Sequence, residues 1–262
     1  VMITTKKGRE GSLNVQFKGT WSIASRAIPR YETMDSYQWT EDLYSMYARE
    51  ARSAGYVGAD VHGYAMAQMI SGPDAIFGKN EQYNPFSRKL SDLIDPATGK
   101  IKEGTDLKWD EDWLDESCAK NPLRQEYVLS VGGGTSKTKY MFSLGYLDQE
   151  GLIKGTDFSR FSARANVEAQ AKEWFKAGLN VNLASNTTNT TTLGSSASSS
   201  SAYSNVFYSC ATMAPIFPVY LKDENGKTVY ENGKPAYDWG ANRPAGANAD
   251  WHPIANLEED KY

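Results

Sequence analysis

The densest group of residues that could do acid–base chemistry is a run of carboxylates near the middle of the chain, formed by Asp110, Glu111, Asp112, Asp115 and Glu116. Glycoside hydrolysis needs a pair of carboxyl groups, one as the acid and one as the base or nucleophile. Adjacent acids in a single loop more often form a solvated face, and nothing in this spacing separates an acid from a base. We therefore expect no catalytic residue here and predict that the protein is not an enzyme.

Metal chemistry is equally poorly supported. The two histidines, His62 and His252, are far apart in regions that we expect to be loops, and no Cys or His stands near them at zinc-ligand spacing. The segment Asp223–Gly226 resembles the start of a calcium loop, but the following ligand positions fail, so a hairpin turn is preferred. Cys118 and Cys210 lack metal-ligand spacing and are either unlinked thiols or a disulfide. We expect no metal and no cofactor.

The composition favours an all-β protein. Aromatic residues make up 12% of the chain, with 16 Tyr and 7 Trp, and there are 22 Gly. The net charge of −4 leaves no basic stripe, so nucleic acid is not expected as a partner. No apolar run approaches the roughly 20 residues of a membrane-spanning helix. For a membrane protein without such helices, a closed β-barrel is the remaining way to pair every backbone group.

Period-two alternation is the strongest pattern in the sequence. In the first run Leu13 and Phe17 fall on one face, and Asn14 and Lys18 fall on the other. Five such runs cover residues 13–23, 126–131, 139–146, 161–170 and 175–183. Most are nearer to the roughly 9–11 residues of a tilted membrane strand than to the 5–6 of an average soluble strand. A soluble sandwich remains the alternative, because its strands alternate in the same way.

The connections between the runs are unequal in length. Gly132–Lys137 and Ala171–Glu173 are short, whereas residues 25–123, Leu147–Arg160 and everything after about residue 187 form long connections. Short periplasmic turns and long extracellular loops are typical of outer-membrane barrels. Aromatic residues lie near the ends of runs, where an interfacial girdle would be: Trp21, Tyr127, Tyr140, Tyr146 and Trp174.

The long connections contain structure of their own. Asp35 can cap a helix that continues to about Ala54, with Leu43, Met46, Tyr47 and Glu50 at helical spacing and Gly55 as a stop. Residues 220–230 predict a hairpin that turns at Asn225–Gly226, and Asn232–Gly233 predicts a second turn. Residues 182–201 are rich in Ser, Thr and Asn, so we expect the fifth run to give way to a polar, flexible segment.

Several segments, taken together and in order, resemble one known family. They are Val1–Gly8, Trp109–Glu116, Gln125–Tyr127, Ser130–Gly133, Lys137–Tyr140, Ser143–Gly151 and Phe161–Asn166. Through these segments the chain resembles TonB-dependent transporters of the SusC/RagA type. Val1–Gly8 is similar to the last strand of the plug domain in that family, and the chain opens as if inside a strand. We therefore expect a fragment: residues 1–11 end the plug, and residues 12–262 begin the barrel, with extracellular loops at about 25–123 and 188–262.

The resemblance implies an antiparallel transmembrane β-barrel of about 22 strands around a plug, of which this chain would supply about five. It further implies import of an oligosaccharide or peptide across the bacterial outer membrane. The expected partners are outer-membrane lipid, a SusD-like surface lipoprotein, and TonB acting through residues not in this chain.

Two sets of residues are then expected to make functional contacts. The inward-facing residues, which should touch the plug, are Lys18, Arg164, Asn180 and Asn182. The loop aromatics, which could meet a ligand or partner, are Tyr203, Tyr208, Trp239 and Trp251.

The main alternative is a soluble all-β glycan-binding or adhesin module, and a secreted β-rich glycosidase is a third possibility. The apolar faces of the runs discriminate between a membrane wall and a module. In a barrel they meet lipid, and in a module they pack against a second sheet. The residues that decide are Leu13, Phe17, Phe142, Leu144, Leu179 and Val181.

Overall fold

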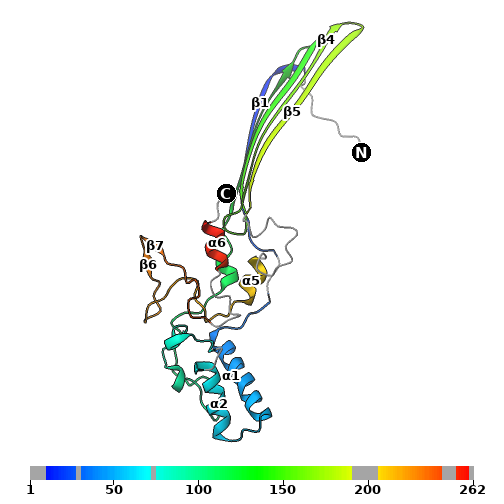
Figure 1. Cartoon of the computed structure of the whole chain (residues 1–262). Coiled ribbons are helices and arrows are strands. Elements are labelled where there is room, and N and C mark those ends of the chain that lie inside the picture. The colour runs from blue at the N-terminus through cyan, green and yellow to red at the C-terminus, as the bar shows by residue number, and fades with distance from the viewer. Residues whose placement is uncertain (1–9, 28–30, 72–74, 191–205, 244–251, 260–262) are drawn as a thin grey trace. The chain divides into compact units, whose positions relative to one another are not determined.

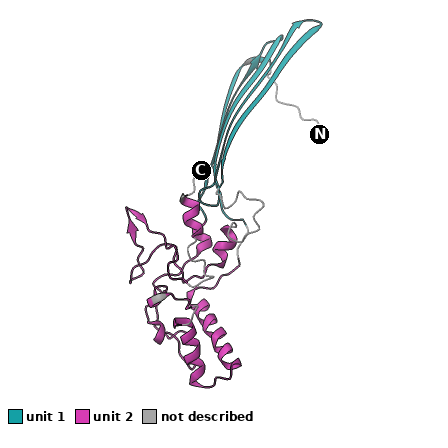
Figure 2. Ribbon diagram, in the orientation of Figure 1, with its two compact units in different colours: residues 1–28, 118–191, 261–262 teal, residues 29–117, 192–260 magenta. Residues whose placement is uncertain are grey.

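The chain divides into two compact units, which are coloured separately in Figure 2. The computed structural model describes residues 10–27, 31–71, 75–190, 206–243 and 252–259. Unit 1 comprises residues 1–28, 118–191 and 261–262, and unit 2 comprises residues 29–117 and 192–260. Unit 1 holds the long strands, and unit 2 is built mainly from residues expected to connect them. Among the helices in the described ranges, none is both long and apolar enough to cross a membrane.

Unit 1 contains one five-stranded antiparallel sheet (Figure 1). Its strands are β1 Gly11–Ile23, β2 Leu123–Gly134, β3 Thr138–Glu150, β4 Asp157–Lys172 and β5 Phe175–Asn189. They lie in the order β1-β2-β3-β4-β5, so each strand pairs with its neighbour in the sequence. Figure 1 shows them side by side in a long, curved sheet. The prediction of five antiparallel strands in one sheet is confirmed, and within the described residues the sheet does not close.

The strands are longer than the alternation predicted, and the connections are correspondingly shorter. Gly132–Gly134 lie inside β2, which leaves Thr135–Lys137 as the turn. Ala171 and Lys172 lie inside β4, so Glu173–Trp174 alone joins it to β5. At the other end β3 and β4 are joined by residues 151–156 only. The predicted limits were wrong because backbone pairing continues beyond the residues whose side chains alternate.

The polar end of β5 shows the same effect. We expected the fifth run to end near residue 183 and a polar segment to follow it, but the strand continues to Asn189. Asn186 and Asn189 there pair with Arg160 and Asp157 of β4. A backbone ladder does not require apolar side chains, so an Asn- and Thr-rich segment can extend a strand that its neighbour already templates.

A glycine in β2 makes room for an aromatic ring. Gly133 pairs with Tyr140 of β3, and a Cβ atom at Gly133 would lie 2.8 Å from the Tyr140 hydroxyl oxygen. The ring therefore lies over the glycine, covering a backbone position that has no side chain of its own.

Two helices open unit 2. α1 spans Ser36–Ser53 and α2 spans Ala59–Ser71. The Asp35 side chain accepts a hydrogen bond from the Gln38 backbone, and the Gln38 side chain accepts one from the Asp35 backbone, which completes a capping box. Gly55 follows the helix with φ +92°, in the left-handed region that glycine tolerates. The predicted helix and both of its ends are confirmed.

The residues whose spacing predicted α1 are not the ones that form its buried face. Tyr44, Ala48 and Ala51 are buried, whereas Met46 and Glu50 are exposed and Leu43 and Tyr47 are only half-buried. In the structure the buried stripe consists mainly of small side chains, which permit a close approach.

The remaining elements of unit 2 are short. They are the 3-10 turns η1 Lys79–Glu81 and η2 Leu90–Asp92, the helices α3 Trp113–Glu116, α5 Val206–Thr212 and α6 Pro253–Glu259, and the strands β6 Tyr230–Glu231 and β7 Lys234–Pro235.

The core of unit 2 encloses an ion pair. Arg243 and Asp238 have side chains that are 0% and 2% exposed, and an Arg243 guanidinium nitrogen lies 3.2 Å from Asp238 Oδ2. The guanidinium carbon lies 4.9 Å from the centre of the Phe217 ring and 5.5 Å from that of Tyr83. The Tyr83 hydroxyl donates to the Ala241 carbonyl at 2.7 Å. A buried charge needs a partner of this kind, and aromatic faces add cation–π attraction.

Both predicted turns near residue 230 are confirmed. The Asp223 amide donates to the Lys227 carbonyl at 2.9 Å, and Gly226 has φ +79°. The Asp223 carboxylate accepts from the Asn225 and Lys227 amides at 2.9 and 2.8 Å, as in an Asx turn. Asn232 and Gly233 have φ of 50° and 79°, which suits the tight turn between β6 and β7.

Candidate functional site

One face of the unit 1 sheet is apolar across all five strands. The strand register aligns its side chains in rows that cross the sheet. One row contains Phe17, Leu129, Leu144, Ala163 and Leu183, and the next contains Val15, Val131, Phe142, Ala165 and Val181. Because each strand alternates and the register is kept, the apolar sides of all strands form one continuous surface.

This apolar face is uncovered. Leu13 is 60% exposed, Phe17 65%, Leu144 48% and Leu179 62%. Phe142 is also exposed, and Val181 is half-buried. No described part of the chain packs on these side chains as the second sheet of a sandwich would. An exposed apolar surface of this extent marks a site of interaction with another protein or with a membrane.

An aromatic row borders the apolar face at one end. Tyr127, Tyr146 and Phe161 are register partners on successive strands, with Trp21 close by on β1. Trp21 Nε1 donates to the Tyr127 hydroxyl at 3.0 Å, and that hydroxyl donates to Gln125 Oε1 at 2.9 Å. These side chains therefore combine apolar rings with satisfied polar ends, as interfacial aromatics do.

The height of the apolar face can be judged on β4. Its outward apolar positions run from Phe161 to Ala169, about 26 Å along a strand and about 20 Å along the normal at a tilt of ~40°. The next row beyond the aromatic one begins with Trp21 and is otherwise polar, with Gln125, Asp148, Ser159 and Thr187. The apolar band is thus comparable in height with the roughly 25 Å band of membrane barrels.

The opposite face of the sheet is polar and carries all four residues that were expected to point inward. Arg164 and Asn182 are register partners, Asn180 lies one row away, and Lys18 lies on the same face of β1. Asn182 Nδ2 donates to Asn180 Oδ1 at 3.1 Å. Their shared face follows from the register, whereas their contact with a plug stays a prediction.

The polar face also contains paired charges. A guanidinium nitrogen of Arg124 lies 2.7 Å from Glu126 Oε2 on β2, and Lys176 Nζ lies 2.5 Å from Glu168 Oε1 between β5 and β4. Such pairs suit a wet surface, where each charge keeps partial contact with water.

Of the four predicted loop aromatics, two lie within the described residues. Tyr208 is 54% exposed on α5, and Trp239 is 46% exposed beyond β7. Tyr203 and Trp251 lie outside the described residues. Trp239 is grouped with two tyrosines that the sequence reasoning missed, Tyr220 and Tyr237. The two-residue spacing of Tyr237 and Trp239 was the available signal, because it places both on one side of an extended segment.

The expectation that both histidines lie in loops is wrong for His62 and holds for His252. His62 is in α2, with Nδ1 3.0 Å from the Tyr44 hydroxyl. His252 immediately precedes α6: the Ala255 amide donates to its Nδ1 at 3.0 Å, and its Nε2 lies 2.8 Å from the Val219 carbonyl. Because Nδ1 accepts and Nε2 donates, the ring is neutral, and burial lowers the pKa of His252 to about 4. The described residues contain no group of His, Cys, Asp and Glu able to hold a metal ion.

Part of the acidic run forms the solvated face that we expected, since Asp110 and Asp115 are exposed, but three of its members also make structural contacts. Asp110 Oδ1 accepts from the Ser36 amide and hydroxyl at 2.9 and 2.7 Å, at the start of α1. Glu111 pairs with Lys222 at 3.1 Å, and burial raises the pKa of Glu111. Asp112 caps α3. The contacts of Asp110 and Glu111 were not anticipated because their partners are distant in sequence, whereas Asp112 caps the helix that directly follows it.

Cys118 and Cys210 are both buried, and they form no disulfide with each other. This outcome selects unlinked thiols from the two alternatives that the sequence left open.

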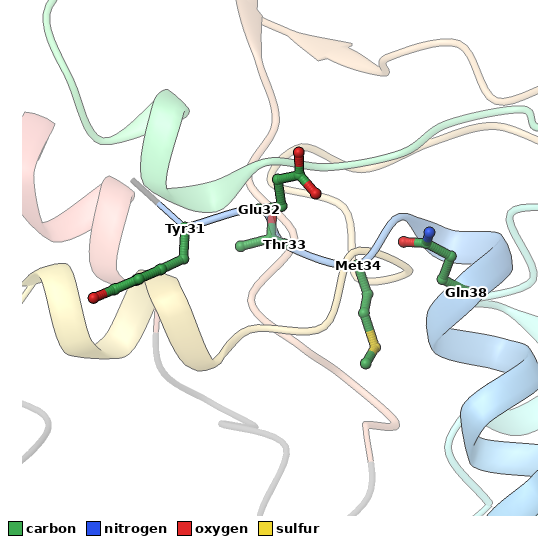
Figure 3. A pocket seen from close by; sticks show the side chains of 5 residues that line it. All are labelled: Tyr31, Glu32, Thr33, Met34 and Gln38. Atoms are coloured by element: carbon green, nitrogen blue, oxygen red, sulfur yellow. The ribbon is translucent and has the colours of Figure 1, made fainter. Parts of the chain in front are cut away.

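An open hollow of about 620 Å³ lies at the start of α1 and is lined by Tyr31, Glu32, Thr33, Met34 and Gln38. Figure 3 shows that these side chains leave the segment in different directions and do not converge on a point. A small-molecule site normally has a few polar groups aimed at one place. This hollow therefore gives no indication of a ligand.

Comparison with known proteins relates the chain to one class of receptor. No family model matches. TonB-dependent receptor P3 of Formosa agariphila is 33% identical over 70 residues, which are 27% of this chain and 7% of that protein. TonB-dependent receptor SusC of Bacteroides thetaiotaomicron is 31% identical over 78 residues, 30% of this chain and 7% of that protein. The chain thus spans only a small part of the length of the curated relatives that it matches.

A solved structure shares the fold. A chain of the RagAB peptide importer in its closed-closed state superposes with a TM-score of 0.50 and 22% sequence identity. The match covers 89% of this chain and 24% of that one.

Proposed function

We propose that this chain, which is similar to the SusC/RagA-type TonB-dependent receptors of the bacterial outer membrane, forms part of the wall of a transmembrane β-barrel. The observation that carries the proposal is the uncovered apolar face of the five-stranded sheet. In a barrel wall this face meets hydrocarbon, and the opposite polar face lines a water-filled lumen. The aromatic row of Tyr127, Tyr146 and Phe161, together with the neighbouring Trp21, then lies at the membrane interface.

The barrel's activity in this proposal is TonB-dependent import of an oligosaccharide or peptide, together with a SusD-like surface lipoprotein. The support is similarity to SusC and to a protein described as a peptide importer. Residues 1–11 would end the plug, and the rest would belong to the barrel, with residues 25–123 and 188–262 outside the cell. TonB would act through residues not in this chain. Lys18, Arg164, Asn180 and Asn182 would face the plug from the lumen side.

The alternative of a soluble glycan-binding or adhesin module is less well supported. Such a module must remove its apolar face from water, and fully burying one Leu or Phe side chain stabilises a protein by about 1.5–3 kcal/mol. Leu13, Phe17, Leu144 and Leu179 are each about half exposed or more. A soluble module that left this whole apolar face in water would lose that stabilisation for each of its exposed apolar side chains.

Spin labelling of neighbouring residues on β3 tests the orientation of the sheet. Leu144→Cys and Ser143→Cys place a label on the apolar and the polar face, with Cys118 and Cys210 replaced by Ser. In liposomes the label at position 144 should be relaxed mainly by dissolved oxygen, and the label at 143 mainly by a water-soluble nickel complex. Equal access of the nickel complex to both labels would refute the membrane wall.

Uptake by intact cells tests the transport activity. Cells that produce the protein should accumulate a labelled oligosaccharide or peptide only when TonB is present. Accumulation that is unchanged by loss of TonB would contradict the energy coupling, whatever the spin labels show.

A further inference from the structure

Unit 2 carries a small aromatic surface that the proposed membrane wall does not use. It consists of Tyr220, Tyr237 and Trp239 and is called the Tyr237 surface below. Tyr220 and Tyr237 are directly opposite each other in an antiparallel bridge, with ring centres 5.5 Å apart. The Trp239 ring centre lies 6.2 Å from that of Tyr237. Opposed residues, and residues two apart, share one side of extended chain, so the three rings stand together.

The rings are supported from behind and accessible in front. The buried His252 ring lies 5.0 Å from Tyr237 and 5.7 Å from Trp239, measured between ring centres. Trp239 is nonetheless 46% exposed, and Tyr220 and Tyr237 are half-buried. Because both His252 nitrogens are engaged in the neutral form, that ring adds no positive charge behind the surface. The Tyr237 surface is therefore rigid and partly open to solvent.

Carboxylates border the Tyr237 surface. The Tyr237 hydroxyl donates to Glu258 Oε2 on α6. Glu116 and Glu111 lie close enough to act on Tyr220 as well, and Glu111 also pairs with Lys222 at 3.1 Å. The pKa of Tyr220 is raised to about 12 by burial and then by the charges of Glu258, Glu116 and Glu111. The titration of Tyr220 thus agrees with the geometry in indicating a negative potential.

We propose that the Tyr237 surface binds the ammonium or guanidinium group of a basic side chain on a peptide substrate, between the aromatic rings and the Glu258 carboxylate. The proposal rests on the proposed import function and narrows its substrate to peptides that carry Lys or Arg. Aromatic faces attract cations, and a neighbouring carboxylate adds a charge-assisted hydrogen bond. A neutral sugar would also stack on the rings, but it gains nothing from the negative charge.

Calorimetry with the full-length protein in detergent tests the site. The probe is the blocked tripeptide acetyl-Gly-Arg-Gly-amide, compared with the same peptide carrying norleucine in place of Arg. We expect Glu258→Gln to weaken binding of the Arg peptide about fivefold, because it removes the charge and keeps a hydrogen-bond acceptor. Trp239→Leu should weaken it about tenfold, and Trp239→Phe should retain most of the binding. Raising the salt from 0.05 to 0.5 M should weaken the wild-type interaction and leave that of Glu258→Gln nearly unchanged.

Matched changes elsewhere control for general effects on the fold. Glu103→Gln removes an exposed carboxylate from another part of unit 2, and Trp174→Leu removes an 84% exposed indole from the turn between β4 and β5. Both should bind the Arg peptide as the wild type does. Equal binding of the Arg and norleucine peptides overturns the proposal. So does the finding that the protein binds a neutral oligosaccharide through Trp239 and binds neither peptide. The TonB-dependent uptake assay reports the import function separately, so a failed site and a failed import function are distinguishable.

Discussion

Acidification should loosen the junction between α6 and the segment around Val219, because that junction depends on a neutral histidine. In the structure Nδ1 of His252 accepts from the Ala255 amide, and Nε2 donates to the Val219 carbonyl. Protonation puts a hydrogen on Nδ1, which then opposes the Ala255 N–H and leaves the first turn of α6 without its acceptor. The charge would also arise in a buried site beside Arg243, whose guanidinium already disfavours it.

The magnitude follows from the two pKa values. The pKa of His252 is about 4 in the folded protein against an ordinary value of 6.5. A depressed folded-state pKa stabilises the fold fully above the ordinary value and loses that contribution as the pH falls from 6.5 to 4. The full difference is on the order of 3 kcal/mol, and about 2 kcal/mol of it is lost by pH 5.

Hydrogen exchange is the suitable assay, because it reads α6 within the intact protein. After correction for intrinsic rates, protection of the α6 amides should fall about 30-fold between pH 7 and pH 5. His252→Asn provides the control, since Asn can accept from the Ala255 amide and does not titrate in this range. Protection that is the same at both pH values, or a pH dependence that persists in His252→Asn, would refute the reasoning.

Three further changes have expected outcomes. Leu144→Arg should lower the stability of the protein in urea-treated liposomes by about 2–4 kcal/mol, whereas Ser143→Arg, on the polar face, should cost far less. Asp35→Ala should destabilise α1 by about 1 kcal/mol, measured by exchange of the α1 amides, with Asp35→Asn close to wild type. Gly133→Val should displace the Tyr140 ring, since even a Cβ would lie 2.8 Å from its hydroxyl oxygen, and the refolded yield in detergent should fall; an unchanged yield would contradict that contact.

The sequence was most informative where local pattern and tertiary environment agree. Alternation predicted the five strands because each strand has a single apolar face, and Asp35 as a candidate cap predicted the start of α1. It was least informative about strand ends, because backbone pairing carries β5 through the polar Asn186 and Asn189.

Contacts between distant parts of unit 2 were also beyond the reach of local pattern. The buried pair of Arg243 and Asp238 depends on rings contributed from far along the chain, and neither charge has a local signal. His252 did have a local signal. It stands directly before Pro253, and proline is favoured at the first position of a helix. A side chain in front of that proline was therefore a candidate cap.

The outer edges of β1 and β5 pair with no strand in the described part of the chain. Each offers a row of free amides and carbonyls along a sheet whose one side is apolar, which is the arrangement that templates edge-to-edge polymerisation. Preparations of this sheet in plain buffer should accordingly deposit as fibrous or amorphous material rich in cross-strand pairing. When the protein is refolded from denaturant, detergent added before the denaturant is removed should instead keep the protein dispersed.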